Sequence, residues 1–344
     1  MKKSTRIICL TVIGLLIQQA VFLFVEKVYM ATDININILK EDDSQDSKNE
    51  AKEFNLKDNV DEVKVSSNGR YAAYLINNKL KVLDSRENTA KTIDSDGEMV
   101  FYKWVTNSDR IIGVQKIKEN GKYYFQPVAF DAKNAQKIDL ADFDLKELKI
   151  QLSNNDDKID NVVFSVGTHS LYIKVKKNNG KCDLYRANTM NQLEKVRSDK
   201  DIGDILVPTT GANAIMEMGS NVTILNSTGN LAVSKFSQPK VLGTDVNDNV
   251  YFGDEVNGKI DKIAYAVASD KYKEWKTISI KTPVEKSNIS VDFSGKIYIN
   301  NEGENNVLEL TTNKTIKYEG KFVQSYSNGV ISRVKNKLIK NPLQ

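Results

Sequence analysis

The stretch VDEVKVSSNGRYAAYLINNKLKVLDS, Val60 to Ser85, determines the fold class. Its apolar residues recur with the alternation of β-strands in three short runs, the second of which is YAAYLI at 71–76. The runs are separated by SNG and NNK, whose residue types favour tight turns. A fourth run, AKTID at 90–94, follows at the same spacing. The stretch therefore predicts a four-stranded antiparallel unit.

The same unit recurs along the chain, seven times over about 285 residues, or about 40 residues per copy. Short runs rich in Val, Ile, Tyr and Phe alternate with clusters of Asn, Asp, Gly and Ser, and no long amphipathic helical pattern interrupts them. The seventh copy has three recognisable strands. The copies begin near Val60, Met99, Lys158, Asp204, Lys240, Ser287 and Lys321.

A lone four-stranded sheet cannot bury both of its faces, whereas sheets stacked around an axis cover one another and leave only short edges exposed. The sequence therefore predicts an all-β protein, a β-propeller of about seven four-stranded blades. Ser66–Asp84 resembles the repeat of TolB-like propellers and of the amino-terminal propeller of dipeptidyl peptidase IV-type proteins. Asn68 stands where that repeat usually has Asp, and Phe164–Ile173 and Val291–Ile299 are weaker matches. The resemblance implies the propeller fold.

The amino terminus predicts one transmembrane helix ahead of the propeller. Ile7–Val25 is an uncharged run of 19 residues, which as a helix spans about 28 Å, close to the thickness of a bilayer core. A cleaved signal peptide is the alternative, but this run is longer than the usual signal core. We favour an uncleaved signal anchor. Because Lys2, Lys3 and Arg6 precede it, the amino terminus is expected in the cytoplasm and the rest outside.

The expected domain organisation follows from these features. Residues 1–30 are a cytoplasmic stub and signal anchor, 31–58 are a tether with a closing strand, and 59–344 are the extracytoplasmic propeller. The segment 40–53 is rich in charge and reads as a solvated tether. Ahead of it, Ile34–Leu39 has strand alternation. We expect this segment to supply the missing outer strand of the last blade and so to close the ring.

Composition restricts the function classes. Lys and Arg number 49 and Asp and Glu 45, for a net charge of +4, which gives no argument for nucleic acid as a partner. The two cysteines exclude a disulfide framework, and a single histidine removes most His-based catalysis and zinc sites. His169 lies between two predicted strands, and we interpret it as an exposed turn residue. No G-x-S-x-G motif of a serine hydrolase occurs.

Two oxygen-rich segments, Asp245–Glu255 and Asn154–Asp160, are candidates for calcium, although turns with hydrogen-bonding side chains explain them as well. The basic run Lys174–Lys181 is interpreted as exposed strand and turn residues, with anionic polymer binding as the alternative. Strand aromatics are interpreted as blade-to-blade core rather than as sugar platforms. They are Trp104, Trp275, Tyr123, Tyr124 and Phe125.

Together these features predict a non-catalytic, membrane-anchored binding or scaffolding module at the bacterial cell envelope. Its partners would be the membrane, through the helix, and a protein or an envelope polymer. No catalytic or cofactor-binding residue and no cofactor is assigned, and a metal site is left open. One alternative is an enzyme with a central-funnel site, carbohydrate-active or lactone-hydrolysing, which would bring three or more acids or amides to one funnel mouth. Another is a sensor domain for a separate partner.

Overall fold

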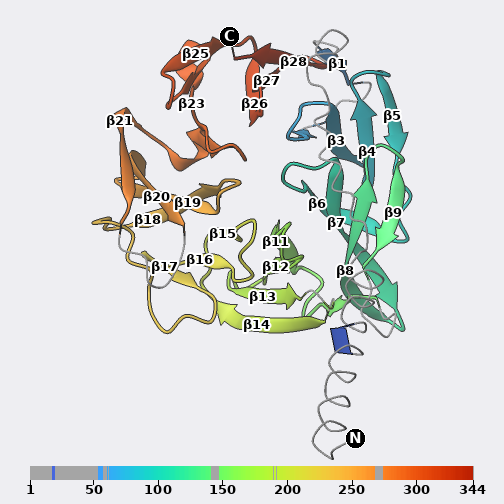
Figure 1. Cartoon of the computed structure of the whole chain (residues 1–344). Coiled ribbons are helices and arrows are strands. Elements are labelled where there is room, and N and C mark those ends of the chain that lie inside the picture. The colour runs from blue at the N-terminus through green and yellow to red at the C-terminus, as the bar shows by residue number, and fades with distance from the viewer. Residues whose placement is uncertain are drawn as a thin grey trace, which may run out of the picture. The chain divides into compact units, whose positions relative to one another are not determined.

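The structure is a computed structural model, and it describes residues 18–19, 53–56, 60, 62–140, 147–188, 190, 192–267 and 274–343. The chain divides into two units, Met1–Glu50 and Ala51–Gln344. The described strands all belong to the second unit and form seven sheets. Figure 1 shows these sheets following one another around a ring. The prediction of an all-β propeller with seven blades is confirmed.

The blades follow the predicted repeats in order, and we number them from the first repeat. Blade 1 contains β2 (Lys64–Val65), β3 (Tyr71–Ile76), β4 (Lys79–Asp84) and β5 (Thr89–Thr92). Blade 2 contains β6 (Glu98–Trp104), β7 (Arg110–Glu119), β8 (Lys122–Asp131), β9 (Gln136–Asp139) and β10 (Ile150–Gln151). Blade 3 contains β11 (Lys158–Phe164), β12 (Leu171–Lys176), β13 (Cys182–Ala187) and β14 (Leu193–Lys200).

The second half of the ring repeats this order. Blade 4 contains β15 (Ile205–Leu206), β16 (Ile215–Met218) and β17 (Asn221–Ile224). Blade 5 contains β18 (Pro239–Thr244), β19 (Asn249–Val256), β20 (Lys259–Val267) and β21 (Lys276–Val284). Blade 6 follows the short 3-10 helix η2 (Lys286–Asn288) with β22 (Ile289–Val291), β23 (Ile297–Asn301), η3 (Glu302–Glu304), β24 (Asn306–Glu309) and β25 (Lys314–Lys317). Blade 7 contains β26 (Lys321–Tyr326), β27 (Gly329–Val334) and β28 (Lys337–Pro342).

Blade 7 obtains its fourth strand from the opposite end of the chain. Strand β1 (Glu53–Asn55) pairs antiparallel with β28, with Phe54 opposite Leu338. Closure by an amino-terminal strand is thus found, and the strand on β28 is Glu53–Asn55. The segment 34–39, which was expected to cover this edge, lies outside the described residues.

Neighbouring blades bury a hydrophobic cluster between them, and this explains why the inner strands are apolar on both faces. In β3, Ala72 and Tyr74 pack into the cluster shared with blade 7, whereas Tyr71 and Ala73 pack into the cluster shared with blade 2. All four side chains are fully buried or nearly so. Because strand side chains alternate between faces, one six-residue strand supplies core to two interfaces.

The turn that carried the family resemblance joins β2 to β3 by side-chain hydrogen bonds. Asn68 Oδ1 accepts from the Ser66 hydroxyl (2.7 Å) and from the Arg70 backbone N–H (2.9 Å). Asn68 therefore accepts as the usual Asp would, and its Nδ2 also donates to Asp109 of blade 2 at 3.0 Å. Gly69 has φ of 73°, and a Cβ there would lie 2.9 Å from the Tyr326 ring of blade 7.

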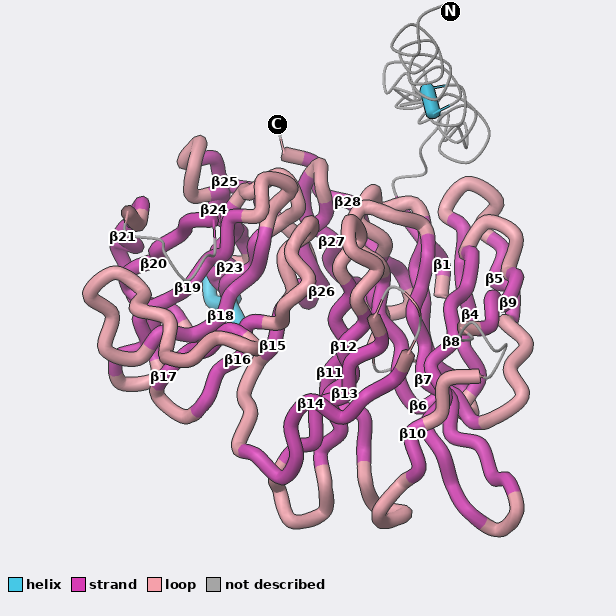
Figure 2. The backbone as a smooth tube through the Cα atoms, turned by 60° about the horizontal axis from the view of Figure 1, so that its bottom comes forward, coloured by secondary structure: helices cyan, strands magenta, loops and turns pink. Residues whose placement is uncertain are grey.

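Two blades depart from the four-strand expectation. Blade 4 has three strands, and its outer edge carries a single bridge between Thr223 and Asn230. Blade 2 gains β10, which pairs with β8 beside the long β7–β8 hairpin (Figure 2). The proposed anchor at 7–25 lies outside the described residues except for Gln18 and Gln19. Within the described part of the chain, no helix combines the length and the apolar character that crossing a bilayer requires.

Candidate functional site

A cavity of about 430 Å³ lies at the centre of the ring. Its walls come mainly from the innermost strands of five consecutive blades, β6, β11, β15, β18 and β22. The innermost strands of a propeller converge on its axis, so residues far apart in the sequence line one space. The volume falls within the range of small-molecule sites, about 300 to 1,000 Å³.

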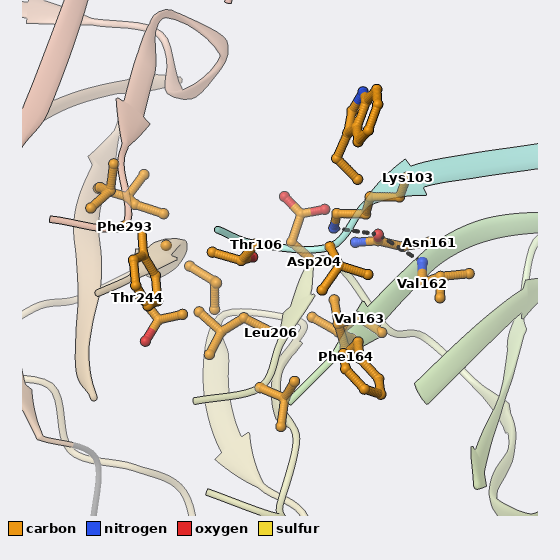
Figure 3. A pocket seen from close by; sticks show the side chains of 18 of the residues that line it. Lys103, Thr106, Asn161, Val162, Val163, Phe164, Asp204, Leu206, Thr244 and Phe293 are labelled. Atoms are coloured by element: carbon orange, nitrogen blue, oxygen red, sulfur yellow. Dashed lines mark hydrogen bonds between the residues drawn. The ribbon is translucent and has the colours of Figure 1, made fainter. Parts of the chain in front are cut away.

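Most of the wall is aliphatic, and charged groups are concentrated on one side. Leu206 of blade 4, Val163 of blade 3 and Phe293 of blade 6 are among the apolar lining residues. Figure 3 shows Lys103 and Asn161 side by side, with Asp204 close to them and Phe293 farther away across the cavity. An apolar cavity with a few convergent polar groups is the usual composition of a ligand site.

Lys103, near the end of β6, is the polar group of greatest interest. Its Nζ donates to Asn161 Oδ1 at 3.2 Å, and within the described residues it makes no ion pair. Burial and, to a smaller extent, the charge of Lys64 lower the pKa of Lys103 to about 8, although Asp204 opposes the shift. A lysine at such a site is charged at neutral pH but loses its proton easily.

Lys64 of β2 approaches the same region but has its own partners. Its Nζ lies 3.1 Å from Glu62 Oε1 and 3.4 Å from the carbonyl oxygen of Tyr102. It also lies 4.9 Å from the centre of the Tyr102 ring. Lys64 thus adds positive charge near Lys103 while its own charge is compensated by Glu62.

Lys286 of η2 lines the cavity and binds two carboxylates. Its Nζ contacts Glu217 Oε1 at 2.6 Å and Asp204 Oδ2 at 2.5 Å. Burial alone would lower the pKa of Lys286, but the hydrogen bonds to Asp204 and Glu217 outweigh burial and raise it. Glu217 is also held by the Val241 backbone N–H at 2.7 Å. This group joins blades 4, 5 and 6, and its one cation and two carboxylates leave a net charge of −1.

The structure separates His169 from the cavity wall. His169 lies exposed in the turn between β11 and β12, with φ of 53°. Its ring stacks on Phe164 at a centroid distance of 6.1 Å. The interpretation of His169 as an exposed turn residue is confirmed.

The oxygen-rich segment Asp245–Glu255 forms a turn and strand β19. Asp245 is buried, and its carboxylate accepts from the backbone N–H groups of Asn247 (2.8 Å) and Asn249 (3.0 Å) and from the Tyr251 hydroxyl (2.9 Å). Asp248 bonds the Thr210 backbone N–H at 2.9 Å. These oxygens stabilise the turn and its contact with blade 4, as the turn interpretation predicts.

The segment Asn154–Asp160 also uses its carboxylates internally. Asp157 Oδ2 accepts from the backbone N–H groups of Ser153 and Asn154, each at 3.0 Å. Asp160 pairs with Lys174 at 2.5 Å. In the part of the chain that the structure describes, no group of three or more His, Cys, Asp or Glu side chains is arranged to hold a metal ion.

The basic run Lys174–Lys181 was interpreted as exposed, but its first residue, Lys174, is buried. Lys174 is 3% exposed, and it donates to the carbonyl oxygen of Ile202 as well as pairing with Asp160. It is therefore an internal group that joins blades 3 and 4 rather than a surface lysine. Lys177, at the turn, pairs with Asp199 at 3.3 Å.

The aromatic residues mostly serve the core. Phe125 is 1% exposed and packs between blades 2 and 3. The Trp275 ring packs edge-on against the Phe252 ring, with 5.6 Å between the ring centroids. Trp104 packs on the blade 1–2 cluster, donates its Nε1–H to the Lys64 carbonyl at 3.0 Å and also lines the cavity. Tyr123 is half-buried, with Lys116 Nζ 4.9 Å from its ring centre.

Sequence analysis did not single out Lys103, Asn161, Asp204 or Lys286. A weak sequence signal for this site exists. Each of these polar residues lies within or just before the first strand of its repeat, where most residues are apolar. Two acids or amides, Asn161 and Asp204, line the cavity in the described part of the chain, and Asp204 is paired with Lys286. The arrangement expected of the central-funnel enzyme required three or more.

Comparison with known proteins supports the fold class. No protein-family model and no curated protein matches the chain. A chain in the mitotic checkpoint complex is similar with a TM-score of 0.50 at 8% identity, over 86% of this chain and 91% of that one. TolB from Acinetobacter baumannii has a TM-score of 0.42 at 12% identity, covering 81% and 65% of the two chains. Dipeptidyl peptidase 4 from Porphyromonas gingivalis has a TM-score of 0.42 at 9% identity, over 79% of this chain and 43% of that one.

The seven sheets around one ring define the class of protein as a β-propeller. The solved structures similar to this chain include TolB and a dipeptidyl peptidase 4. At identities this low the similarity shows a shared fold and nothing further about activity.

Proposed function

We propose that this protein is a non-catalytic binding or scaffolding module, anchored in the cell membrane by its amino-terminal helix, with the propeller outside the cytoplasm at the cell envelope. The observation that carries the binding role is the use of charge at the central cavity. Lys286 of blade 6 binds both Asp204 and Glu217 of blade 4, and Glu217 also accepts from the Val241 backbone N–H of blade 5. Acids engaged in this way hold the shape of a site, whereas general acid–base catalysis needs a group free to exchange its proton.

The ring offers a rigid frame for such a role. Seven interblade clusters and the β1–β28 pairing fix the blades, so the turns at both ends of the ring are held in place. The similar propeller in the mitotic checkpoint complex is part of a protein assembly, and a protein partner is therefore our first expectation here, with an envelope polymer as the second.

The location is proposed from the sequence alone. The uncharged run Ile7–Val25 follows three basic residues, which favours an anchor with its amino terminus in the cytoplasm. Protease added to intact protoplasts should digest the propeller and leave a small protected fragment. A variant that lacks residues 7–25 should leave the membrane fraction. Protection of the whole chain, or recovery of a mature form beginning near residue 32, would contradict the anchor.

The partner is best sought by photo-crosslinking in intact cells. A photoreactive residue is placed in the full chain at Asn107, in the turn between β6 and β7, or at Asn120, in the turn between β7 and β8. Both are turn residues with positive φ, and they lie at opposite ends of β7. A binding face predicts a specific adduct from one position and not the other. Equal, non-specific adducts from both positions would contradict a binding surface at these turns.

A further inference from the structure

The amine of Lys103 and the amide of Asn161 leave donors facing the central cavity. Asn161 Oδ1 is occupied, because it accepts from Lys103 Nζ at 3.2 Å and from the Val162 backbone N–H at 2.8 Å. This assigns the oxygen side of the amide, and within the described residues Asn161 Nδ2 donates to no partner. Neither Lys103 nor Asn161 Nδ2 has an acid partner among the described residues. Figure 3 shows the two groups adjacent on one wall.

The charged groups around Lys103 leave its own charge uncompensated by close contact. From β2, Lys64 pairs with Glu62. From the blade 4 wall, Asp204 pairs with Lys286, which also holds Glu217. Glu62 balances Lys64, whereas Lys286 with its two carboxylates carries one net negative charge. Among the described residues, Lys103 makes no ion pair and has a single amide contact. A monocarboxylate beside Lys103 would supply that ion pair and would offer two acceptor oxygens to the ammonium and amide donors.

The apolar part of the cavity wall favours an anion that carries an apolar group. Leu206, Val163 and Phe293 face the same space, and a cavity of about 430 Å³ holds more than a bare ion. A fully hydrated inorganic anion would leave this apolar wall unused. An aliphatic or aromatic group that fills it would gain burial free energy of about 25 cal/mol for each Å² of apolar surface removed from water.

We propose that the central cavity binds a small monocarboxylate with an apolar body, its carboxylate held by Lys103 and Asn161. Phosphate is a poorer match, because it carries more charge and the charge of Lys286 is already compensated by two carboxylates. The inference goes beyond the proposed scaffolding role and is tested separately from it, since crosslinking probes the turns of the ring and the titration below probes the cavity.

The test is a titration of the purified full chain with 4-(trifluoromethyl)benzoate, followed by fluorine NMR. We expect saturable binding that Lys103→Met weakens at least tenfold and that Lys103→Arg largely preserves, because arginine keeps the positive charge. Lys118→Met, on the exposed part of β7, is the matched control and should bind like the wild type. The uncharged analogue 4-(trifluoromethyl)benzamide should bind at least tenfold more weakly, and inorganic phosphate should not compete at equal concentration.

The pH dependence of wild-type binding provides a second measurement that needs no variant. Because the pKa of the free Lys103 is lowered to about 8, the ammonium is present below pH 8 and lost above it. Affinity should therefore be highest below pH 8 and fall about tenfold for each pH unit between 8 and the higher pKa that Lys103 has in the complex, whereas Lys103→Arg should show no such fall. Equal affinity for the benzoate and the benzamide, or binding that Lys103→Met leaves unchanged, would overturn the proposal. So would binding by phosphate alone.

Discussion

Replacing Phe54 with alanine should open the ring at its closing blade. Phe54 is the central residue of the three-residue strand β1 and has no exposed surface. It packs with Leu338 and Tyr326 in the cluster between blades 7 and 1, and Lys340 Nζ lies 5.3 Å from its ring centre. Loss of a buried phenylalanine costs about 3 to 5 kcal/mol. We expect the full effect here, because the short strand has little else to hold it on β28.

The assay is urea unfolding followed by tryptophan fluorescence and circular dichroism. Phe54→Ala should lower the free energy of unfolding by about 3 to 5 kcal/mol, and Phe54→Leu by less than about 1.5 kcal/mol because volume is nearly kept. Glu53→Ala is the matched control on the same strand. It removes only the exposed contact with Lys337 at 2.8 Å, which is worth at most about 1 kcal/mol.

The comparison also separates β1 from the segment that the sequence suggested. Deletion of residues 33–40 should leave the midpoint of unfolding unchanged, since β28 is paired with Glu53–Asn55. A loss of stability on that deletion as large as that of Phe54→Ala would refute closure by β1 alone. A Phe54→Ala protein within 1 kcal/mol of the wild type would refute the reasoning about the ring itself.

Four further predictions concern other parts of the ring. Gly69→Ala should destabilise by about 1 to 3 kcal/mol more than Gly121→Ala in urea unfolding, because both have positive φ but only the first Cβ meets an aromatic ring; equal losses would contradict the contact. Lys286→Met should cost on the order of 2 kcal/mol, since it leaves two carboxylates without their cation, and a neutral result would show that water replaces it. Lys103 has a folded-state pKa of about 8, below the ordinary lysine value of 10.5; the folded state therefore releases its proton first, and the free energy of unfolding relative to Lys103→Met should rise between pH 8 and 10. His169→Asn should shift stability by no more than about 0.5 kcal/mol, since asparagine tolerates positive φ, and loss of any hydrolytic activity in this variant would contradict a non-catalytic role.

Local sequence was sufficient to predict the turn of the first repeat and the turn positions of several polar residues. Asn68 and Asp245 act on neighbouring backbone groups within a few residues of themselves, so their roles depend on local sequence. His169 lies in a turn that flanking strand patterns define.

The repeat pattern determined the class of fold and the number of blades, because each copy is apolar on both faces and must be covered by a neighbour. The sequence did not determine which amino-terminal strand closes the ring: 34–39 alternates more clearly than 53–55, but strand pairing depends on where the chain ends meet in space. The central site was decided only by the tertiary structure. Lys103, Asn161, Asp204 and Lys286 span more than 180 residues of sequence, and no local pattern connects them. They meet because the ring brings the first strands of its blades to one axis, where the Lys103 ammonium lines the cavity without an ion pair to any described residue.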